Sequence, residues 1–306
     1  MSSRAFKRAK SFLPLYLMLV PGIIYLAINN YLPMGGAIVA FKSYNFQKGI
    51  WGSDFAGLKN FEFLFKTKEA WIITRNTILY NSLFIVVGTI LAIAVAILLN
   101  EIRWVAGKRF YQTVILVPFL ISIVVVSYLV YAFLSTEYGF LNTSLLKALN
   151  QKRISWYSQP KWWPWILLIV NVWKNLGYNC IIYYATIVGI DRSYYEAAVI
   201  DGASRWGQTR WITLPSLRST ITILTLMAVG RIFYSDFGLF FQVPLNSGPL
   251  IDVTNTIDTY VYRGLIELNN IGMSSAAGLY QSFVGFALVL ATNFIAKKMD
   301  KDSALF

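Results

Sequence analysis

The chain has 306 residues, of which 57% are hydrophobic and only 13% are charged. A soluble domain carries about a quarter charged residues, so this composition excludes a soluble protein and predicts an integral membrane protein. The absence of histidine and the single cysteine, Cys180, exclude histidine-based catalysis, disulfides and ordinary zinc sites. The net charge of +13 is typical of cytoplasmic loops beside anionic lipids, and without a basic–aromatic motif we expect no nucleic-acid partner.

A membrane-spanning helix needs about 20 apolar residues. The predicted spans are 12–32, 72–99, 113–134, 163–189, 217–241 and 273–296. The first is interpreted as a retained helix and not a signal peptide, because it is long, contains two prolines and lacks a small-x-small cleavage site. The short apolar piece after it, which ends at Phe41, is expected to be a re-entrant or interfacial segment.

These spans divide the chain into three parts. We expect an N-terminal part (1–70) with the first span, the re-entrant segment and an extracytoplasmic loop, then a transmembrane domain (71–297), then a cytoplasmic tail (298–306). Lysine and arginine are about twice as dense in the segments on one side of the predicted spans as on the other. The positive-inside rule therefore places both termini, and the polar stretch between the fourth and fifth spans, in the cytoplasm.

That polar stretch, residues 193–215, reads SYYEAAVIDGASRWGQTRWITLP. Ser193 and Glu196 form a capping-box pattern, which predicts that a helix starts there. Gly202 stands where a helix ends or bends, and a second helix is expected over 203–213. A helix–bend–helix with alanine and glycine at its tip is a compact knob that can enter a cleft on another protein.

The string EAA-x3-G-x9-I-x-L-P within this stretch, in a chain of six spans, resembles the permease subunits of binding-protein-dependent ABC importers. The flanking segments starting LPLYLMLVPGIIYLAINNYLPMGG, DTYVYRGL and AAGLYQSFVGFALVLATN are similar to permeases of complex-carbohydrate importers of the LplB type, in the carbohydrate uptake group. In that family the loop forms coupling helices that dock into a cleft of the ATPase subunit. The resemblance implies these coupling residues: Glu196, Ala197, Ala198, Asp201, Gly202, Ala203, Ile212, Leu214 and Pro215.

The resemblance also implies a fold, partners and a location. The fold is expected to be all-α, with the six transmembrane helices of the type I ABC importer. The implied partners are a second homologous permease, two ATPase subunits, an extracytoplasmic solute-binding lipoprotein and an oligosaccharide, in the bacterial cytoplasmic membrane. The chain lacks a G-x4-G-K-[ST] phosphate loop, so ATP and Mg are expected on the partner ATPase. We expect no catalytic residue, cofactor or metal on this chain.

Ionisable residues inside spans are candidates for function. Lys174 lies near mid-membrane in the fourth span, where it snorkels toward the interface, pairs with the partner permease or lines the translocation path. Arg231 and Asp236 lie in the fifth span, five residues apart, so an ion pair between them is not favoured. The predicted path residues are Trp173, Lys174, Asn175, Tyr178, Arg231 and Asp236. If the two cations line the path, the cargo is expected to be acidic, such as an oligosaccharide containing uronic acids.

Three other functions remain open at this point. The coupling motif is compatible with an importer of peptides, amino acids or ions, although the flanking segments argue against it. An intramembrane glycosyl- or acyltransferase would need clustered acids, bases or metal ligands, and a channel would need no ATPase. Co-purification with an ATPase subunit distinguishes the importer from the enzyme and the channel.

Overall fold

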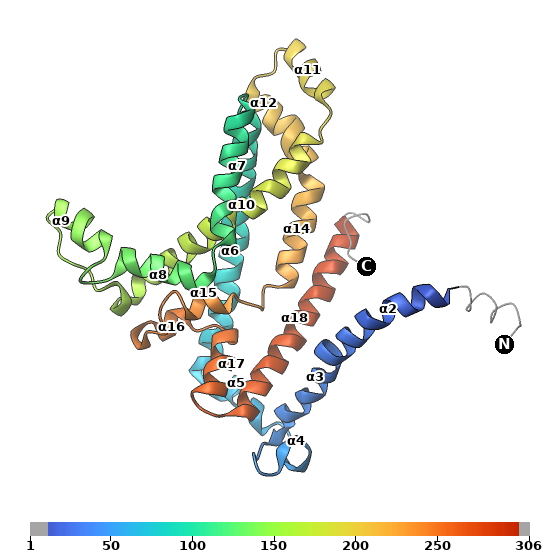
Figure 1. Cartoon of the computed structure of the whole chain (residues 1–306), viewed down its shortest axis with the longest axis vertical. Helices are drawn as coiled ribbons and strands as arrows, with labels where there is room; N and C mark the ends of the chain where they lie inside the picture. Colours follow the sequence, from blue (N-terminus) through green and yellow to red (C-terminus); the bar gives the residue numbers. More distant parts are fainter. Residues whose placement is uncertain (1–11, 300–306) are drawn as a thin grey trace, which may run out of the picture.

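The computed structural model describes residues 12–299 and is built almost entirely of helices (Figure 1). The first membrane-length helix runs without a break from Pro14 to Phe41. It consists of α2 (Leu13–Leu26), the π-helical η1 (Ala27–Tyr31), α3 (Leu32–Met34) and the 3-10 helix η2 (Gly35–Phe41). The piece ending at Phe41, expected to be separate and re-entrant, therefore continues this helix. The two glycines at its start are compatible with a tighter helix and do not interrupt it.

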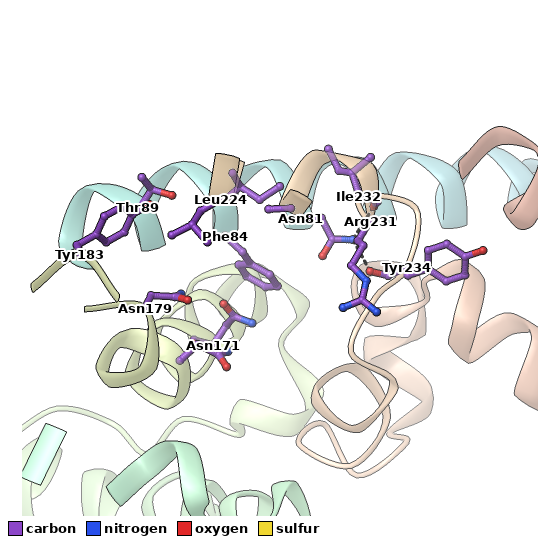
Figure 2. Close-up of a pocket in the computed structure, with 13 residues that line it drawn as sticks. Asn81, Phe84, Thr89, Asn171, Asn179, Tyr183, Leu224, Arg231, Ile232 and Tyr234 are labelled. Atoms are coloured by element: carbon purple, nitrogen blue, oxygen red, sulfur yellow. Dashed lines mark hydrogen bonds between the residues drawn. The ribbon is translucent and has the colours of Figure 1, made fainter. Parts of the chain in front are cut away.

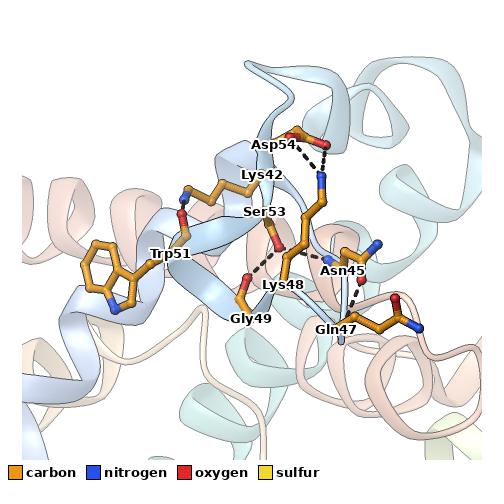
Figure 3. Close-up of polar contacts among 8 residues, drawn as sticks. All are labelled: Lys42, Asn45, Gln47, Lys48, Gly49, Trp51, Ser53 and Asp54. Atoms are coloured by element: carbon orange, nitrogen blue, oxygen red, sulfur yellow. Dashed lines mark hydrogen bonds and ion pairs between the residues drawn. The ribbon is translucent and has the colours of Figure 1, made fainter.

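A small ordered hairpin follows the first helix. It contains β1 (Lys42–Ser43), α4 (Gly49–Gly52) and β2 (Asp54–Phe55), and is followed by η3 (Lys59–Phe61) and α5 (Phe63–Lys66). The strands are antiparallel, with Lys42 opposite Phe55. The ammonium group of the buried Lys42 donates to the carbonyl oxygen of Ile50 at 2.8 Å. It also donates to the carbonyl oxygen of Trp51 at 3.1 Å (Figure 3). These bonds tie α4, at the tip of the hairpin, to β1 at its base.

Three long helices form the frame of the molecule: α6 (Lys68–Glu101), α10 (Trp163–Val188) and α18 (Ile271–Met299). Three apolar cores lie along α6, one with α17 (Ile257–Ile266) and α18, a middle one with α10, and one with the end of α10 that holds the buried Cys180. Because α6 contributes to all three cores, it is the common support of the bundle.

Two of the predicted spans are bent or broken. The third becomes α7 (Val105–Leu120) and α8 (Ile123–Leu134), which meet at 97°. The fifth starts earlier than expected, in a helical stretch from Arg205 that bends by 55° into α14 (Arg218–Gly230), and α14 ends well before residue 241. Four helices of the described chain are therefore long and apolar enough to span a membrane, or six if each bent pair counts as one span.

The remaining helices are short and connect these elements. They are η4 (Leu141–Leu145), α9 (Leu146–Ala148), η5 (Trp156–Ser158), η6 (Pro160–Trp162), α11 (Arg192–Ile200), α12 (Arg205–Gln208), η7 (Thr209–Thr213), α13 (Leu214–Ser216), α15 (Phe237–Phe241), η8 (Gly248–Leu250) and α16 (Ile251–Thr254). In Figure 1, α11 and α12 lie at one end of the molecule, and α4, α5 and α17 lie at the other.

Gly177 allows α10 to touch the backbone of α7. A Cβ atom at this position would lie 1.9 Å from the carbonyl oxygen of Ile115 and 2.9 Å from the Cα of Leu116. Both contacts are with backbone, which cannot rotate away as a side chain can. A Cβ at Gly88, on α6, would meet nothing within 4 Å.

We therefore predict that Gly177→Ala destabilises the protein, because α7 and α10 must separate to accept a methyl group. Overpacking of this kind costs about 1–3 kcal/mol. The measurement is the melting temperature of the purified protein in detergent, with Gly88→Ala as the matched control. Equal melting temperatures for the two variants would show that the helices separate freely.

Candidate functional site

The polar stretch between the fourth and fifth predicted spans is a helix–bend–helix, as the sequence predicts, but it starts differently. The N-cap of α11 is Asp191, whose carboxylate accepts a hydrogen bond from the backbone N–H of Ser193 at 2.9 Å. This bond lowers the pKa of the exposed Asp191. The predicted capping box of Ser193 and Glu196 is therefore wrong, because the helix begins earlier and Glu196 lies within it.

The bend after α11 is a Schellman motif closed by Gly202. This glycine has φ +78°, a left-handed conformation that a side chain disfavours. The N–H of Ala203 donates to the carbonyl of Ala198 at 2.8 Å, and the N–H of Gly202 donates to that of Val199 at 3.1 Å. These two bonds satisfy carbonyls at the helix end and define the motif. Gly202 therefore sets the shape of the tip.

The tip of this loop is exposed and partly apolar. Among the coupling residues implied by the sequence, six are exposed and three are half-buried. The exposed ones are Glu196, Ala197, Asp201, Gly202, Ala203 and Pro215, and the half-buried ones are Ala198, Ile212 and Leu214. Ile200 is 86% exposed, and Trp206 is 70% exposed. Large apolar side chains exposed together in one loop are typical of a binding site for another protein.

The loop also contacts the ends of α6 and α7. The guanidinium group of Arg205 donates to the carboxylate of Glu101 across the gap. Both side chains are largely exposed, and an exposed ion pair contributes only about 0.2–1 kcal/mol. A hollow of about 610 Å³ lies between the loop and these helix ends, and Glu196 is among its lining residues. The loop is therefore held loosely at its base and keeps open space beneath it.

A second cavity, of about 300 Å³, lies between α6, α10 and the end of α14. Its lining is rich in amides, with three from α10 and one from α6, namely Asn171, Asn175, Asn179 and Asn81. The three α10 residues are four apart, so they share one face of that helix. Figure 2 shows Asn171 and Asn179 on one side of the cavity and Thr89 and Phe84 on the other. This mixture of amides, a hydroxyl and an aromatic ring can hydrogen-bond sugar hydroxyls and cover apolar sugar faces.

Arg231 is the charged residue among those that line the cavity. It follows directly after the last residue of α14, and its side chain extends from the edge of the cavity in Figure 2. The cavity can therefore offer a guanidinium group, which binds carboxylates through paired hydrogen bonds.

The structure separates the predicted path residues into two groups. Asn175 and Arg231 line the cavity, whereas Trp173, Lys174, Tyr178 and Asp236 are not among its lining residues. Lys174 donates to the carbonyl oxygens of Phe119 at 3.3 Å and Ile121 at 2.6 Å, where α7 ends. The ring of Tyr178 stacks on that of Phe119 at 4.7 Å between centroids. Asp236 accepts from the N–H of Leu239 at 3.1 Å as the N-cap of α15.

The sequence interpretation named only Asn175 and Arg231 among the residues that line the cavity, and the polar residues it missed include Asn81, Asn171, Asn179 and Thr89. The spacing of the asparagines around Asn175 was a usable signal, since residues four apart in a helix lie on one face. Asn81 and Thr89 carry no such signal, because their place opposite α10 follows from the packing of α6 against α10.

A model of the family described as binding-protein-dependent transport system inner membrane component matches residues 85–301. The chain belongs to this family. The permease is 36% identical to protein LplB of Bacillus subtilis (strain 168) over 289 residues, which cover 94% of this chain and 90% of that protein. It is 33% identical to the polygalacturonan/rhamnogalacturonan transport system permease protein YteP of the same organism, covering 94% and 89%.

A solved structure agrees with these relatives. One chain of a bacterial ABC transporter involved in the import of the acidic polysaccharide alginate matches the permease with a TM-score of 0.88 and 30% identity, covering 97% of this chain and 99% of that chain. A second structure of the alginate transporter, in complex with an alginate pentasaccharide-bound periplasmic protein, matches equally well. The prediction of an all-α membrane permease with this importer fold is confirmed. The location of the termini stays a prediction, because they lie outside the described residues.

We predict that Lys174 contributes more to stabilising the helix break between α7 and α8 than to binding the cargo. Replacing it by Met leaves two carbonyl oxygens without a donor in an apolar environment, which costs about 1–3 kcal/mol for each unsatisfied group. We expect Lys174→Met to lower the melting temperature of the purified permease, and Lys174→Arg, which keeps N–H donors, to lower it less. A Lys174→Met variant with wild-type stability and weakened cargo binding would contradict this assignment.

Proposed function

We propose that the permease is one of two homologous membrane subunits of an ATP-driven importer of oligosaccharides. It takes the sugar from an extracytoplasmic binding protein and moves it into the cytoplasm by alternating access. The amide-lined cavity beside Arg231 is the observation that carries this proposal, since its chemistry suits a sugar and it lies between the three helices that such a movement would shift. Similarity to LplB, YteP and the alginate transporter chain supports a polysaccharide-derived cargo.

We further propose that the loop from α11 to α13 faces the cytoplasm and docks into an ATPase subunit. Its exposed apolar tip and its glycine-closed bend fit a coupling element. ATP and Mg belong to that ATPase, because this chain has no phosphate-binding loop. Closure of two ATPases would pull the docked loops together, and the differential contacts of each state would drive the switch between outward and inward access.

The second permease subunit would cover the first helix. Residues 14–35 of this helix are all exposed in the described chain. This helix contacts the rest of the protein through η2, which packs on α18. Lipid covers part of its surface, and a homologous partner is a suitable occupant for the remainder.

The cargo is proposed to be acidic, with Arg231 as the residue that recognises its charge. The alginate transporter supports this, since its cargo is an acidic polysaccharide. Lys174, which we also expected to contribute, is engaged by the carbonyl oxygens of the α7 break. Arg231, at the edge of the cavity, is therefore the residue expected to distinguish acidic from neutral sugars.

Replacing Gly202 by Val is predicted to uncouple ATP hydrolysis from uptake. The left-handed conformation costs a side chain about 1–2 kcal/mol, so the variant should reshape the tip and leave the spans unchanged. The readouts are membrane insertion, co-purification of the ATPase subunit, ATP hydrolysis and uptake in proteoliposomes. The control is Gly207→Ala, whose Cβ would make an ordinary contact at 3.5 Å.

Normal uptake by Gly202→Val would contradict the coupling role of the tip. Failure of wild-type permease to co-purify with any ATPase would overturn the importer proposal itself, and would favour a channel or an enzyme.

Charge recognition predicts that Arg231→Gln impairs uptake of a uronate oligomer more than uptake of its carboxyl-reduced, neutral counterpart. A lost hydrogen bond to a charged group costs about 1.5–3 kcal/mol, so the half-saturating concentration should rise about tenfold or more for the acidic sugar. Arg231→Lys should retain part of the difference. Because the binding protein also discriminates, each variant is compared with wild type using the same binding protein. Equal effects on both sugars would remove the acidic-cargo proposal.

A further inference from the structure

The segment 231–236, between α14 and α15, leaves the helical conformation inside the fifth predicted span. A helix supplies partners for its own carbonyl groups, whereas an unwound segment does not. In an apolar environment each unsatisfied carbonyl is costly, so such a segment persists only where neighbouring groups bond to it. Segment 231–236 begins with Arg231, so whatever holds it also places that side chain at the cavity.

Side chains from three different helices bond to this segment. The amide of Asn81, on α6, donates to the carbonyl oxygen of Ile232 at 2.7 Å, and the bond is drawn in Figure 2. The buried amide of Gln281, on α18, donates to the carbonyl of Phe233 at 2.6 Å. The carboxylate of Asp258, on α17, accepts from the backbone N–H of Ser235 at 2.7 Å.

Two of these side chains also bond to one another. The Nε2 of Gln281 donates to Oδ1 of Asp258 at 3.0 Å, while Oδ2 of Asp258 takes the N–H of Ser235. Each carboxylate oxygen thus accepts one bond, and the amide nitrogen of Gln281 serves two acceptors. Burial raises the pKa of Asp258, and these two hydrogen bonds partly oppose the rise. The bond between Asp258 and Gln281 joins α17 and α18 at the unwound segment.

The chemistry of this cluster suits a holding role. Asn81 and Gln281 present donors to carbonyl oxygens, and Asp258, when ionised, presents acceptors to N–H groups, so each partner matches the group it meets. Asp258 and Gln281 are not among the residues that line the cavity. Asn81 alone of them lines the cavity, on the same side as Ile232 and Tyr234.

We propose that Asn81, Asp258 and Gln281 are positioning residues that hold segment 231–236 and thereby set where Arg231 meets the cargo. This inference rests on the proposed function for its effect on transport, and on hydrogen bonds alone for its effect on the segment. It links α17, at the end of the molecule opposite the coupling loop, to the edge of the cavity (Figure 1).

The test uses the full importer complex in proteoliposomes or nanodiscs, with the variants Asn81→Leu and Gln281→Leu. The matched controls are the adjacent residues, Ser82→Ala on α6 and Ser282→Ala on α18, since Ser282 bonds only to the carbonyl of Gly278 in its own helix. Three quantities are measured. The first is amide hydrogen exchange across 231–236, and the others are the half-saturating concentration and the maximal rate of uptake for a uronate oligomer and its reduced counterpart.

We expect faster exchange across the segment in both Leu variants and wild-type exchange in both controls. The uptake test rests on Gln281→Leu, because Gln281 is buried and does not line the cavity, whereas Asn81 does. In this variant the half-saturating concentration for the acidic sugar should rise about tenfold, with a smaller change for the neutral sugar and for the maximal rate, because the loss falls on Arg231. A uniform loss for both sugars in Gln281→Leu, or unchanged exchange in either Leu variant, would overturn the proposal.

Asp258→Asn keeps the test valid if a Leu variant fails to fold. The amide has the shape of the carboxylate but can accept at only one atom, so one of its two bonds is lost. We expect an intermediate rise in exchange at Ser235, and wild-type exchange would contradict the inference. A further outcome is that Arg231→Gln leaves uptake of the acidic sugar unchanged while exchange still rises in the Asn81, Gln281 and Asp258 variants. In that case the acidic-cargo proposal fails, and the proposal that these three residues hold segment 231–236 stands.

Discussion

Backbone polar groups that leave a helix in an apolar environment need new partners, and this constraint shapes two of the helix interruptions in the described part of the permease. Between α7 and α8 the partner is the ammonium group of Lys174. At segment 231–236 the partners are the side chains of Asn81, Asp258 and Gln281. In each case the donor or acceptor comes from a different helix, so the breaks also tie helices together.

The cavity lies beside the second of these breaks. On α10 the amides stay at helical spacing, so Asn171, Asn175 and Asn179 form a regular stripe. Arg231 instead lies where helical periodicity has ended, and its position depends on the groups that hold the segment. In the proposed function, this stripe of amides would bond sugar hydroxyls, while the position of the cation depends on the residues that hold segment 231–236.

At the other end of the molecule, the loop from α11 to α13 depends mainly on local sequence. Asp191 caps α11, Gly202 closes it in a left-handed conformation, and Ser204 caps α12. Each of these signals acts within a few residues, so the loop forms its bend without help from the bundle. Its contact with α6, through Arg205 and Glu101, is exposed and weak. The loop therefore exposes apolar side chains at its tip, while its base is held to α6 only weakly and can shift.

The sequence by itself determined the apolar runs, the helix–bend–helix of residues 193–215 with its bend at Gly202 and, through its motifs, the family. These features depend on hydropathy and on residues close together in the chain. Only the tertiary structure decided which apolar runs bend and which asparagines line a cavity. It also decided that Lys174 bonds to carbonyl oxygens at the end of α7, whereas Arg231 lines the cavity. The reason is physical: an apolar run is compatible with either a straight or a broken helix. Partners 53 and 151 positions away, such as Ile121 for Lys174 and Ile232 for Asn81, determine which one forms.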